Sequence, residues 1–188
     1  MKVFETFKVY NNRYFMFVSE NEKSEVNFFD EITVYYYINN IKTILFQDFL
    51  GEGIKSFYNI TSKVLMNKLD VPESYLLKGV GYEWNLVNNY IANELDNDIE
   101  DVTAPYLMWS TPSKYANETW MYNNNNNIYL EVSKDYKWHY SAPKETDNFI
   151  TFDEFKRIYH PYDIVELDVN LVKEWNRKCV EIIDKMQV

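Results

Sequence analysis

The sequence has very little cysteine, and this excludes a disulfide framework. Cys179 is the only cysteine among 188 residues, so no disulfide forms within the chain. Charged side chains interrupt residues 1–8 before the apolar segment of a signal peptide can form. We therefore expect a protein of the reducing cytoplasm.

Glycine is scarce as well, and this excludes the common phosphate-binding motifs. The four glycines are Gly51, Gly53, Gly79 and Gly81. Their spacing matches neither G-x-G-x-x-G nor the G-x-x-x-x-G-K-[ST] loop. Both glycine pairs therefore indicate turns, and we expect no cofactor.

Histidine and cysteine are too few to indicate a metal site or an activated nucleophile. His139 and His160 lie far apart in the sequence, and neither has a second ligand residue at chelating spacing. Cys179 falls on the apolar stripe of a predicted helix, where a thiol usually packs as a small buried hydrophobe. We assign no metal ligand and no catalytic residue from these patterns.

Basic residues are outnumbered, with 19 Lys and Arg against 29 Asp and Glu, and the net charge is −10. This charge repels phosphate backbones and anionic lipids. No window approaches the roughly 18 apolar residues of a membrane-spanning helix. Nucleic acid and membranes are therefore not expected partners. Hydrophobic residues nevertheless make up 46% of the chain, which predicts a single globular domain over residues 1–188.

The N-terminal quarter predicts two β-hairpins. Short runs of β-branched and aromatic residues cover residues 3–10, 13–19, 32–38 and 41–46. Asparagine separates the members of each pair, as at Asn39-Asn40, and asparagine tolerates the positive φ that a two-residue turn requires. We expect a meander of about four antiparallel strands.

Helical periodicity follows, and the C-terminal part mixes strands with helices. We expect a break at Gly51-Glu52-Gly53, then helices over residues 54–69 and 83–95. Strands are expected over residues 105–110, 115–122 and 128–132, with the five asparagines at 123–127 forming a flexible hairpin loop. Thr151-Phe152-Asp153-Glu154 fits a capping box. Asp168 or Asn170 should cap an amphipathic helix that follows. The predicted fold is α+β, mostly antiparallel sheet with N-terminal hairpins, central helices and a C-terminal amphipathic helix.

The acidic residues are unevenly distributed. No basic residue occurs between Lys78 and Lys114. That stretch contains six acidic residues, and five of them form a local cluster within eight positions: Glu94, Asp96, Asp98, Glu100 and Asp101. The cluster fits either a solvated loop or a docking surface for a basic protein, because complementary charge speeds association and enforces specificity. Trp109 follows shortly, and tryptophan is a common interface anchor, although a core position suits it equally.

In size, acidity and lack of catalytic motifs, the chain resembles bacterial toxin-immunity proteins. Residues 69–76, Leu-Asp-Val-Pro-Glu-Ser-Tyr-Leu, are also similar to the Leu-Pro-x-x-Tyr segment of SMI1/KNR4-type immunity proteins, with Val71 in place of the usual leucine. The resemblance implies a cytoplasmic inhibitor that neutralises a basic toxin, in many cases a nuclease, without catalysis. It covers one short segment, so the predicted fold is taken from the residue patterns alone.

Three functions remain open from the sequence. The first is an immunity-type protein whose partner-binding residues are Glu94, Asp96, Asp98, Glu100, Asp101 and Trp109. The second is a ligand-binding or structural accessory protein in which tyrosine and tryptophan line a pocket or an interface. The third is an enzyme with a His-centred site, which requires a pocket that brings His139 or His160 within hydrogen-bond reach of another polar group.

Overall fold

The computed structural model describes residues 2–10, 12–19, 26–94, 101–112 and 114–186. Its first sheet is an antiparallel meander in the order β1-β2-β3-β4. The strands are β1 (Lys2–Tyr10), β2 (Arg13–Ser19), β3 (Glu31–Ile38) and β4 (Ile41–Phe49). This confirms the predicted N-terminal hairpins, and Asn39 and Asn40 adopt the expected positive φ of 49° and 70°.

A second antiparallel sheet is formed by the later strands in the order β5-β6-β7-β8. The strands are β5 (Leu107–Ser110), β6 (Asn117–Asn124), β7 (Asn127–Lys134) and β8 (Asp163–Leu167). The α-helices are α1 (Leu50–Leu65), α2 (Val80–Glu94), α3 (Phe152–Ile158) and α4 (Val169–Lys185). Short 3-10 helices cover Glu73–Leu77 (η1) and Ala104–Tyr106 (η2). The fold is therefore α+β.

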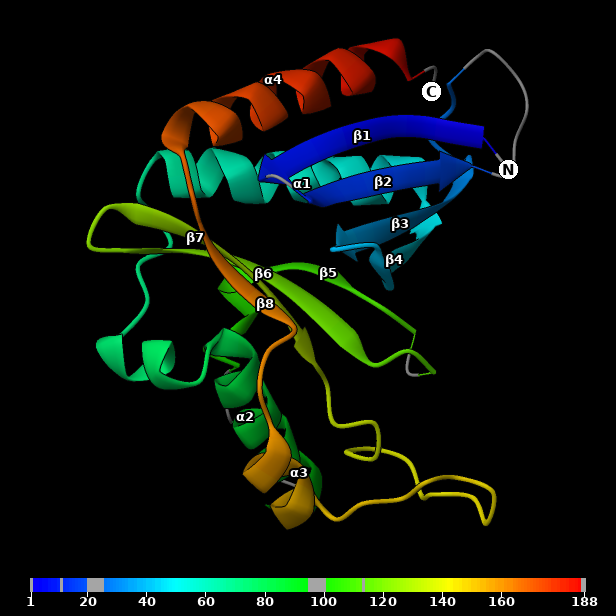
Figure 1. Ribbon diagram of the computed structural model, residues 1–188, viewed down its shortest axis with the longest axis vertical. Helices are drawn as coiled ribbons and strands as arrows, with labels where there is room; N and C mark the ends of the chain where they lie inside the picture. Colours follow the sequence, from blue (N-terminus) through cyan, green and yellow to red (C-terminus); the bar gives the residue numbers. More distant parts are fainter. Residues whose placement is uncertain (1, 11, 20–25, 95–100, 113, 187–188) are drawn as a thin grey trace.

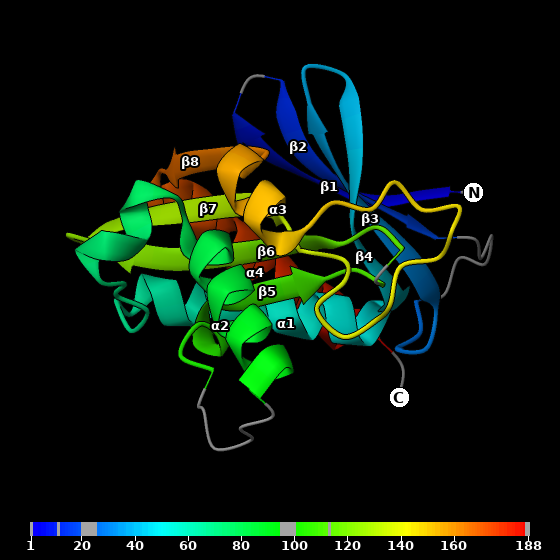
Figure 2. The ribbon, with the colours of Figure 1, turned by 90° about the horizontal axis from the view of Figure 1, so that it is seen from below.

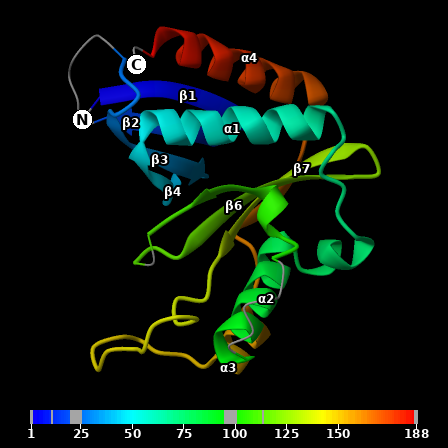
Figure 3. The ribbon, with the colours of Figure 1, turned by 180° about the vertical axis from the view of Figure 1, so that it is seen from behind.

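The elements are stacked in layers along the long axis of the molecule (Figure 1). Helices α1 and α4 lie against one another beside the first sheet, and α1 also packs against β5 and β6 of the second sheet (Figure 3). Helices α2 and α3 cover the opposite face of the second sheet, as the view from below shows (Figure 2). No helix within the described ranges is both long and apolar enough to span a membrane.

Aromatic side chains fill the space between the two sheets. The ring of Phe57 on α1 lies 5.1 Å from that of Trp109 and 5.6 Å from that of Trp175, measured between centroids. The Trp109 indole donates a hydrogen bond to the Gly53 carbonyl at 3.0 Å. Such edge and tilted ring contacts add to the free energy of burial. One buried cluster therefore joins both sheets with α1 and α4.

The chain changes from strand to helix close to Gly51-Glu52-Gly53, as predicted, but the predicted turn is wrong, because α1 begins at Leu50 and includes both glycines. At each glycine, a neighbouring aromatic ring occupies the space that a side chain would need. A Cβ at Gly51 would stand 2.0 Å from the Phe28 ring, and one at Gly53 would stand 2.8 Å from the Phe46 ring. Glycine serves close packing here, and a sequence pattern does not distinguish that use from a turn.

The predicted asparagine loop is shorter than expected. Strand β6 continues through Asn124, and only Asn125 and Asn126 form the turn, with φ of 49° and 67°. Asn123 is buried, and its amide donates to the Val64 carbonyl at 3.0 Å and accepts from the Leu69 amide at 3.3 Å. This side chain therefore joins the end of α1 to the second sheet.

The predicted caps of the C-terminal helices are confirmed. Thr151 and Glu154 form the capping box of α3, and the Asp168 side chain accepts from the first backbone amides of α4. The apolar stripe of α4 is buried as expected, with Val172, Trp175 and Cys179 all at most 1% exposed.

Replacing Asn123 by alanine should lower the free energy of unfolding by about 2 kcal/mol, because it leaves the buried Val64 carbonyl and Leu69 amide without their side-chain partner. Chemical denaturation measures the change. Asn127→Ser, at an exposed asparagine of the same run, should alter stability by less than about 0.5 kcal/mol. Equal effects of the two substitutions would contradict the structural role of Asn123.

Candidate functional site

A pocket of about 510 Å³ opens between α2, the segment that follows β7 and the start of α3. Four aromatic rings form much of its wall, and they belong to Tyr136, Trp138, Phe149 and Phe152. The rings contact one another edge to face, with 5.2 Å between the centroids of Trp138 and Phe149 and 5.2 Å between those of Tyr136 and Phe152. The wall also includes the polar residues Asn89, Asn93 and His139.

A buried carboxylate sets the position of α2, and with it one side of this pocket. Glu131 on β7 is fully buried and accepts hydrogen bonds from the first amides of the helix, Val80 at 2.8 Å and Gly81 at 2.9 Å. Negative charge at a helix N-terminus is favourable. Burial nevertheless raises the pKa of Glu131 to about 7, against the lowering by these two amides. Gly79 precedes the helix with φ of +92°, and a Cβ there would meet the Glu131 carboxylate at 2.5 Å.

Asn85 connects α2 to the pocket through four polar contacts. Its amide nitrogen donates to the carbonyls of Gly81 at 2.6 Å and Lys134 at 3.0 Å. Its amide oxygen accepts from the Tyr136 backbone amide at 2.6 Å. This oxygen also lies 3.2 Å from His139 Nε2. Because the backbone contacts fix which end of the amide is oxygen, His139 Nε2 must carry the proton in that contact.

The His139 side chain is 3% exposed, and its burial lowers the pKa of the imidazole to about 4. The ring is therefore neutral near pH 7. With the proton on Nε2, Nδ1 holds a lone pair that can only accept a hydrogen bond. Nδ1 is buried and has no partner among the described residues. The pocket wall thus contains a buried, unused hydrogen-bond acceptor.

Two further carboxyls are buried near this histidine. Asp135 Oδ1 lies 3.6 Å from His139 Nε2, and burial raises the pKa of Asp135 to about 6. Burial and the neighbouring charge of Asp135 raise the pKa of Glu118 to about 9. Glu118 is therefore protonated near pH 7. Within the described ranges, no three His, Cys, Asp or Glu side chains are grouped so as to hold a metal ion.

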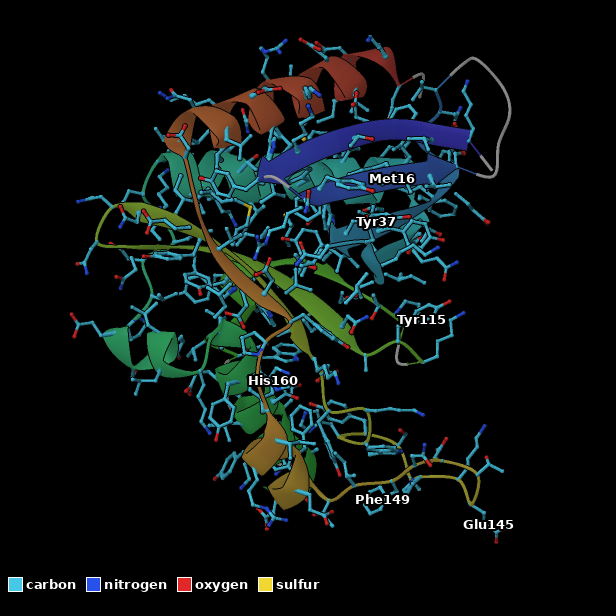
Figure 4. The ribbon with its side chains drawn as sticks, viewed as in Figure 1. Met16, Tyr37, Tyr115, Glu145, Phe149 and His160 are labelled. Carbon is cyan, nitrogen blue, oxygen red and sulfur yellow. The ribbon has the colours of Figure 1, made fainter. Side chains whose placement is uncertain are left out.

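The outer wall of the pocket belongs to the long segment between β7 and α3, which extends away from the second sheet (Figure 4). Asp147 organises part of this segment, accepting from the Lys144 amide at 3.0 Å and lying 3.4 Å from Lys137 Nζ. These contacts lower the pKa of Asp147. Phe149 is 47% exposed, so an apolar ring stands at the mouth of the pocket.

The structure describes only part of the predicted partner-binding set. Asp96, Asp98 and Glu100 lie outside the described residues, and Glu94 is the last residue of α2. Asp101 is described, and its carboxylate accepts from the Thr103 hydroxyl at 2.6 Å and from the Thr103 amide at 3.0 Å. Burial raises the pKa of Tyr140, next in sequence to His139, and the charges of Asp135 and Asp101 raise it further.

Trp109 is 2% exposed and packs in the core between the two sheets. It offers no surface to a partner, so its predicted interface role is wrong. The reason is that β5 places its ring against Phe15, Phe17 and Phe57, contacts with residues of the first sheet and of α1.

The other residues considered for chemistry lie apart from the pocket. His160 is exposed, and its Nδ1 lies 3.1 Å from the Ile158 carbonyl oxygen. Cys179 is fully buried, and burial raises the pKa of its thiol to about 12. Neither residue has the surroundings of a reactive group.

Of the pocket residues, only His139 was a candidate site residue from the sequence alone. The sequence feature that could have indicated the pocket is the high density of aromatic residues between Tyr136 and Phe155. In an irregular segment, aromatic side chains are shielded from water only when they pack against one another or against a ligand. The partners on α2, Asn85 and Asn89, carry no comparable signal. Asparagine within a helix reads as a neutral surface residue.

No family model, no curated protein and no solved structure matches this chain.

His139 should stay neutral down to a pH near its lowered pKa of about 4, with the proton on Nε2, because burial disfavours the imidazolium. Nitrogen chemical shifts of the two imidazoles, followed from pH 8 to pH 4, distinguish both the tautomer and the charge. The exposed His160 gives the second set of signals in the same spectra. Protonation of His139 at pH 6, or a proton on Nδ1 at neutral pH, would contradict the assigned contact with Asn85.

Glu118→Gln should change how stability depends on pH. The pKa of Glu118 is raised from 4.5 to about 9 in the folded state, so the folded protein holds a proton that the unfolded chain releases. The wild-type free energy of unfolding should therefore fall, relative to the variant, by up to about 1.4 kcal/mol per pH unit between these two values. Denaturation at pH 5, 7 and 9 measures this, with the exposed Glu145→Gln as control. Parallel pH profiles for wild type and Glu118→Gln would exclude a buried neutral Glu118.

Proposed function

We propose that this protein is a non-catalytic binding protein for a basic protein partner, in the manner of toxin-immunity inhibitors. The partner would contact the surface at the C-terminal end of α2. The observation that supports this most is that the acidic C-terminal end of α2 lies beside a pocket with aromatic walls. Protein interfaces combine charge, which selects the partner, with aromatic side chains, which contribute much of the binding energy.

The C-terminal end of α2 favours positive charge. The last turn contains Glu94 and no basic residue, so the carbonyls and the negative end of the helix dipole are not offset by a cation of the helix itself. In sequence, Asp96, Asp98 and Glu100 stand between Glu94 and Asp101. The helix end therefore favours a basic partner.

Exposed aromatic side chains lie beside this helix end. Tyr140 is 68% exposed, yet its hydroxyl donates to Asn88 Oδ1 on α2 at 2.7 Å. Phe149 is 47% exposed and contacts Trp138. A tyrosine that is held by one hydrogen bond while its ring faces solvent loses little conformational freedom on binding, which favours its use as an anchor.

The surroundings of His139 favour binding over catalysis, although the pocket meets the geometric condition of the alternative, an enzyme with a His-centred site. An imidazole whose pKa is lowered to about 4 is a weak general base near pH 7. Its Nε2 is already directed at Asn85. These features suit an acceptor that orients a bound group.

Reversing the charge of Asp96, Asp98 and Glu100 to lysine should remove most of the binding of a basic partner. We expect wild-type protein, immobilised and exposed to a lysate of its own organism, to capture a basic protein. The triple variant should then bind the identified partner at least about tenfold more weakly, chiefly through slower association at low salt. Surface plasmon resonance at two salt concentrations measures both rates.

A control with the same charge change is available on α4, where Glu174, Glu181 and Asp184 are exposed. The lysine variant of these three residues should bind the partner with nearly the wild-type affinity. Capture of no basic protein, or equal loss of affinity in both triple variants, would overturn the proposed function.

A further inference from the structure

A second pocket, of about 440 Å³, lies against the other side of α3. It is lined by Lys78, Tyr82, Asp153, Lys156 and Arg157. Three of these five side chains are cations and one is a carboxylate, in a chain whose net charge is −10. The pocket is therefore locally basic on a protein that is acidic as a whole.

The three cations are differently engaged. Lys156 Nζ lies 2.7 Å from Asp153 Oδ1. Lys78 Nζ lies over the Tyr82 ring, 4.2 Å from its centroid. The Arg157 guanidinium makes no ion pair within 4.0 Å with any residue that the structure describes. Both Lys78 and Arg157 are exposed, so their donors can turn toward a ligand.

Two carboxylates near these cations limit how much positive charge is available. Burial raises the pKa of Glu83, although the nearby charge of Lys78 opposes this rise. Hydrogen bonds from Thr151 lower the pKa of Glu154, and the charge of Arg157 adds to this lowering. Glu154, however, is already bound to the Thr151 amide at 2.8 Å in the capping box. The Asp153 carboxylate is paired with Lys156. The donors of Lys78 and Arg157 therefore remain as the anion-binding groups of this pocket.

The basic pocket and the aromatic pocket adjoin each other, because Asp153 and Lys156 line both of them. Lys156 also lies over the Phe152 ring, 5.1 Å from its centroid. On one side of Lys156 are four aromatic rings and Asn89. On the other side are Lys78 and Arg157.

We infer that the two pockets form one binding site for an aromatic heterocycle that carries a phosphate, such as a nucleoside monophosphate. The heterocycle stacks among Trp138, Phe149 and Phe152, since aromatic side chains bind the face of any nucleobase. The phosphate binds the guanidinium of Arg157, whose planar donors match its oxygens, and the ammonium of Lys78.

A single nucleotide fits this site better than a nucleic acid does. The basic pocket is small and the remaining surface is acidic, so it repels the successive phosphates of a polymer. The site also contains no glycine-rich loop, so the sequence motifs of phosphate-binding loops do not reveal it. The inference is independent of the proposed protein partner.

Isothermal titration calorimetry with adenosine monophosphate, adenosine and inorganic phosphate tests the inference. We expect the monophosphate to bind more tightly than either fragment. Lys78→Ala/Arg157→Ala should weaken the monophosphate at least about tenfold and leave adenosine unchanged. Phe149→Ala, which truncates an exposed ring, should weaken both the monophosphate and adenosine.

The matched control is Lys173→Ala/Lys185→Ala, which removes the same charge from exposed positions on α4, at the far end of the molecule (Figure 1). It should not alter the affinity for the monophosphate. Absence of binding at millimolar ligand would overturn the inference, as would equal affinities for the monophosphate and inorganic phosphate. An unchanged affinity in the Lys78→Ala/Arg157→Ala variant would overturn it too. None of these outcomes bears on capture of a basic protein, so the two proposals fail separately.

Discussion

The carboxylate of Glu131 is the contact on which the rest of this site depends. It reaches from the centre of the second sheet to the first amides of α2, and hydrogen bonds to a charged group contribute about 1.5–3 kcal/mol each. Because the carboxylate accepts hydrogen bonds from the N-terminal amides of α2, it fixes the direction of this helix across the sheet. The helix in turn positions Asn85, Asn88 and Asn89. Asn85 and Asn88 hydrogen-bond to Tyr136 and Tyr140 in the segment after β7, and Asn89 lines the aromatic pocket. The same arrangement requires glycine at position 79, because this residue has a positive φ and because a Cβ there would clash with the Glu131 carboxylate.

Neutral polar groups are concentrated around the pocket of a strongly acidic protein. Burial keeps the imidazole of His139 uncharged near pH 7, while the two charged residues that line the pocket, Asp153 and Lys156, are exposed or partly exposed. Such an arrangement selects a bound group by hydrogen-bond direction inside and by charge outside. The two proposals share the aromatic residues and differ in the charges they use: a protein partner would contact the acidic end of α2, and a small anion with an aromatic ring would bind Lys78 and Arg157 beside α3.

Local patterns predicted the elements well where a short stretch of chain decides the outcome. The hairpins, the capping box at Thr151 and the cap at Asp168 depend on residues within a few positions of each other. The failures involve distant contacts. Gly51 and Gly53 look like turn residues until Phe28 and Phe46 are seen against them, and Asn123 looks like a loop residue until its bonds to Val64 and Leu69 are known. Trp109 is of a residue type that often anchors interfaces, but it lies in the core, and only the packing around it distinguishes these two roles.

By itself, the sequence determined an α+β protein of net charge −10, built from antiparallel hairpins and capped helices, with an acidic stretch after the central helix. Hydrophobic periodicity, turn chemistry and charge are properties of neighbouring residues, so they can be read along the chain. Only the tertiary structure decided that His139 is neutral with an unused acceptor, that aromatic rings of an irregular segment form a pocket, and that Lys78 joins Arg157 beside it. Each of these depends on groups separated by about fifty residues or more, such as His139 and Asn85, and no local pattern records which distant residues the fold brings together.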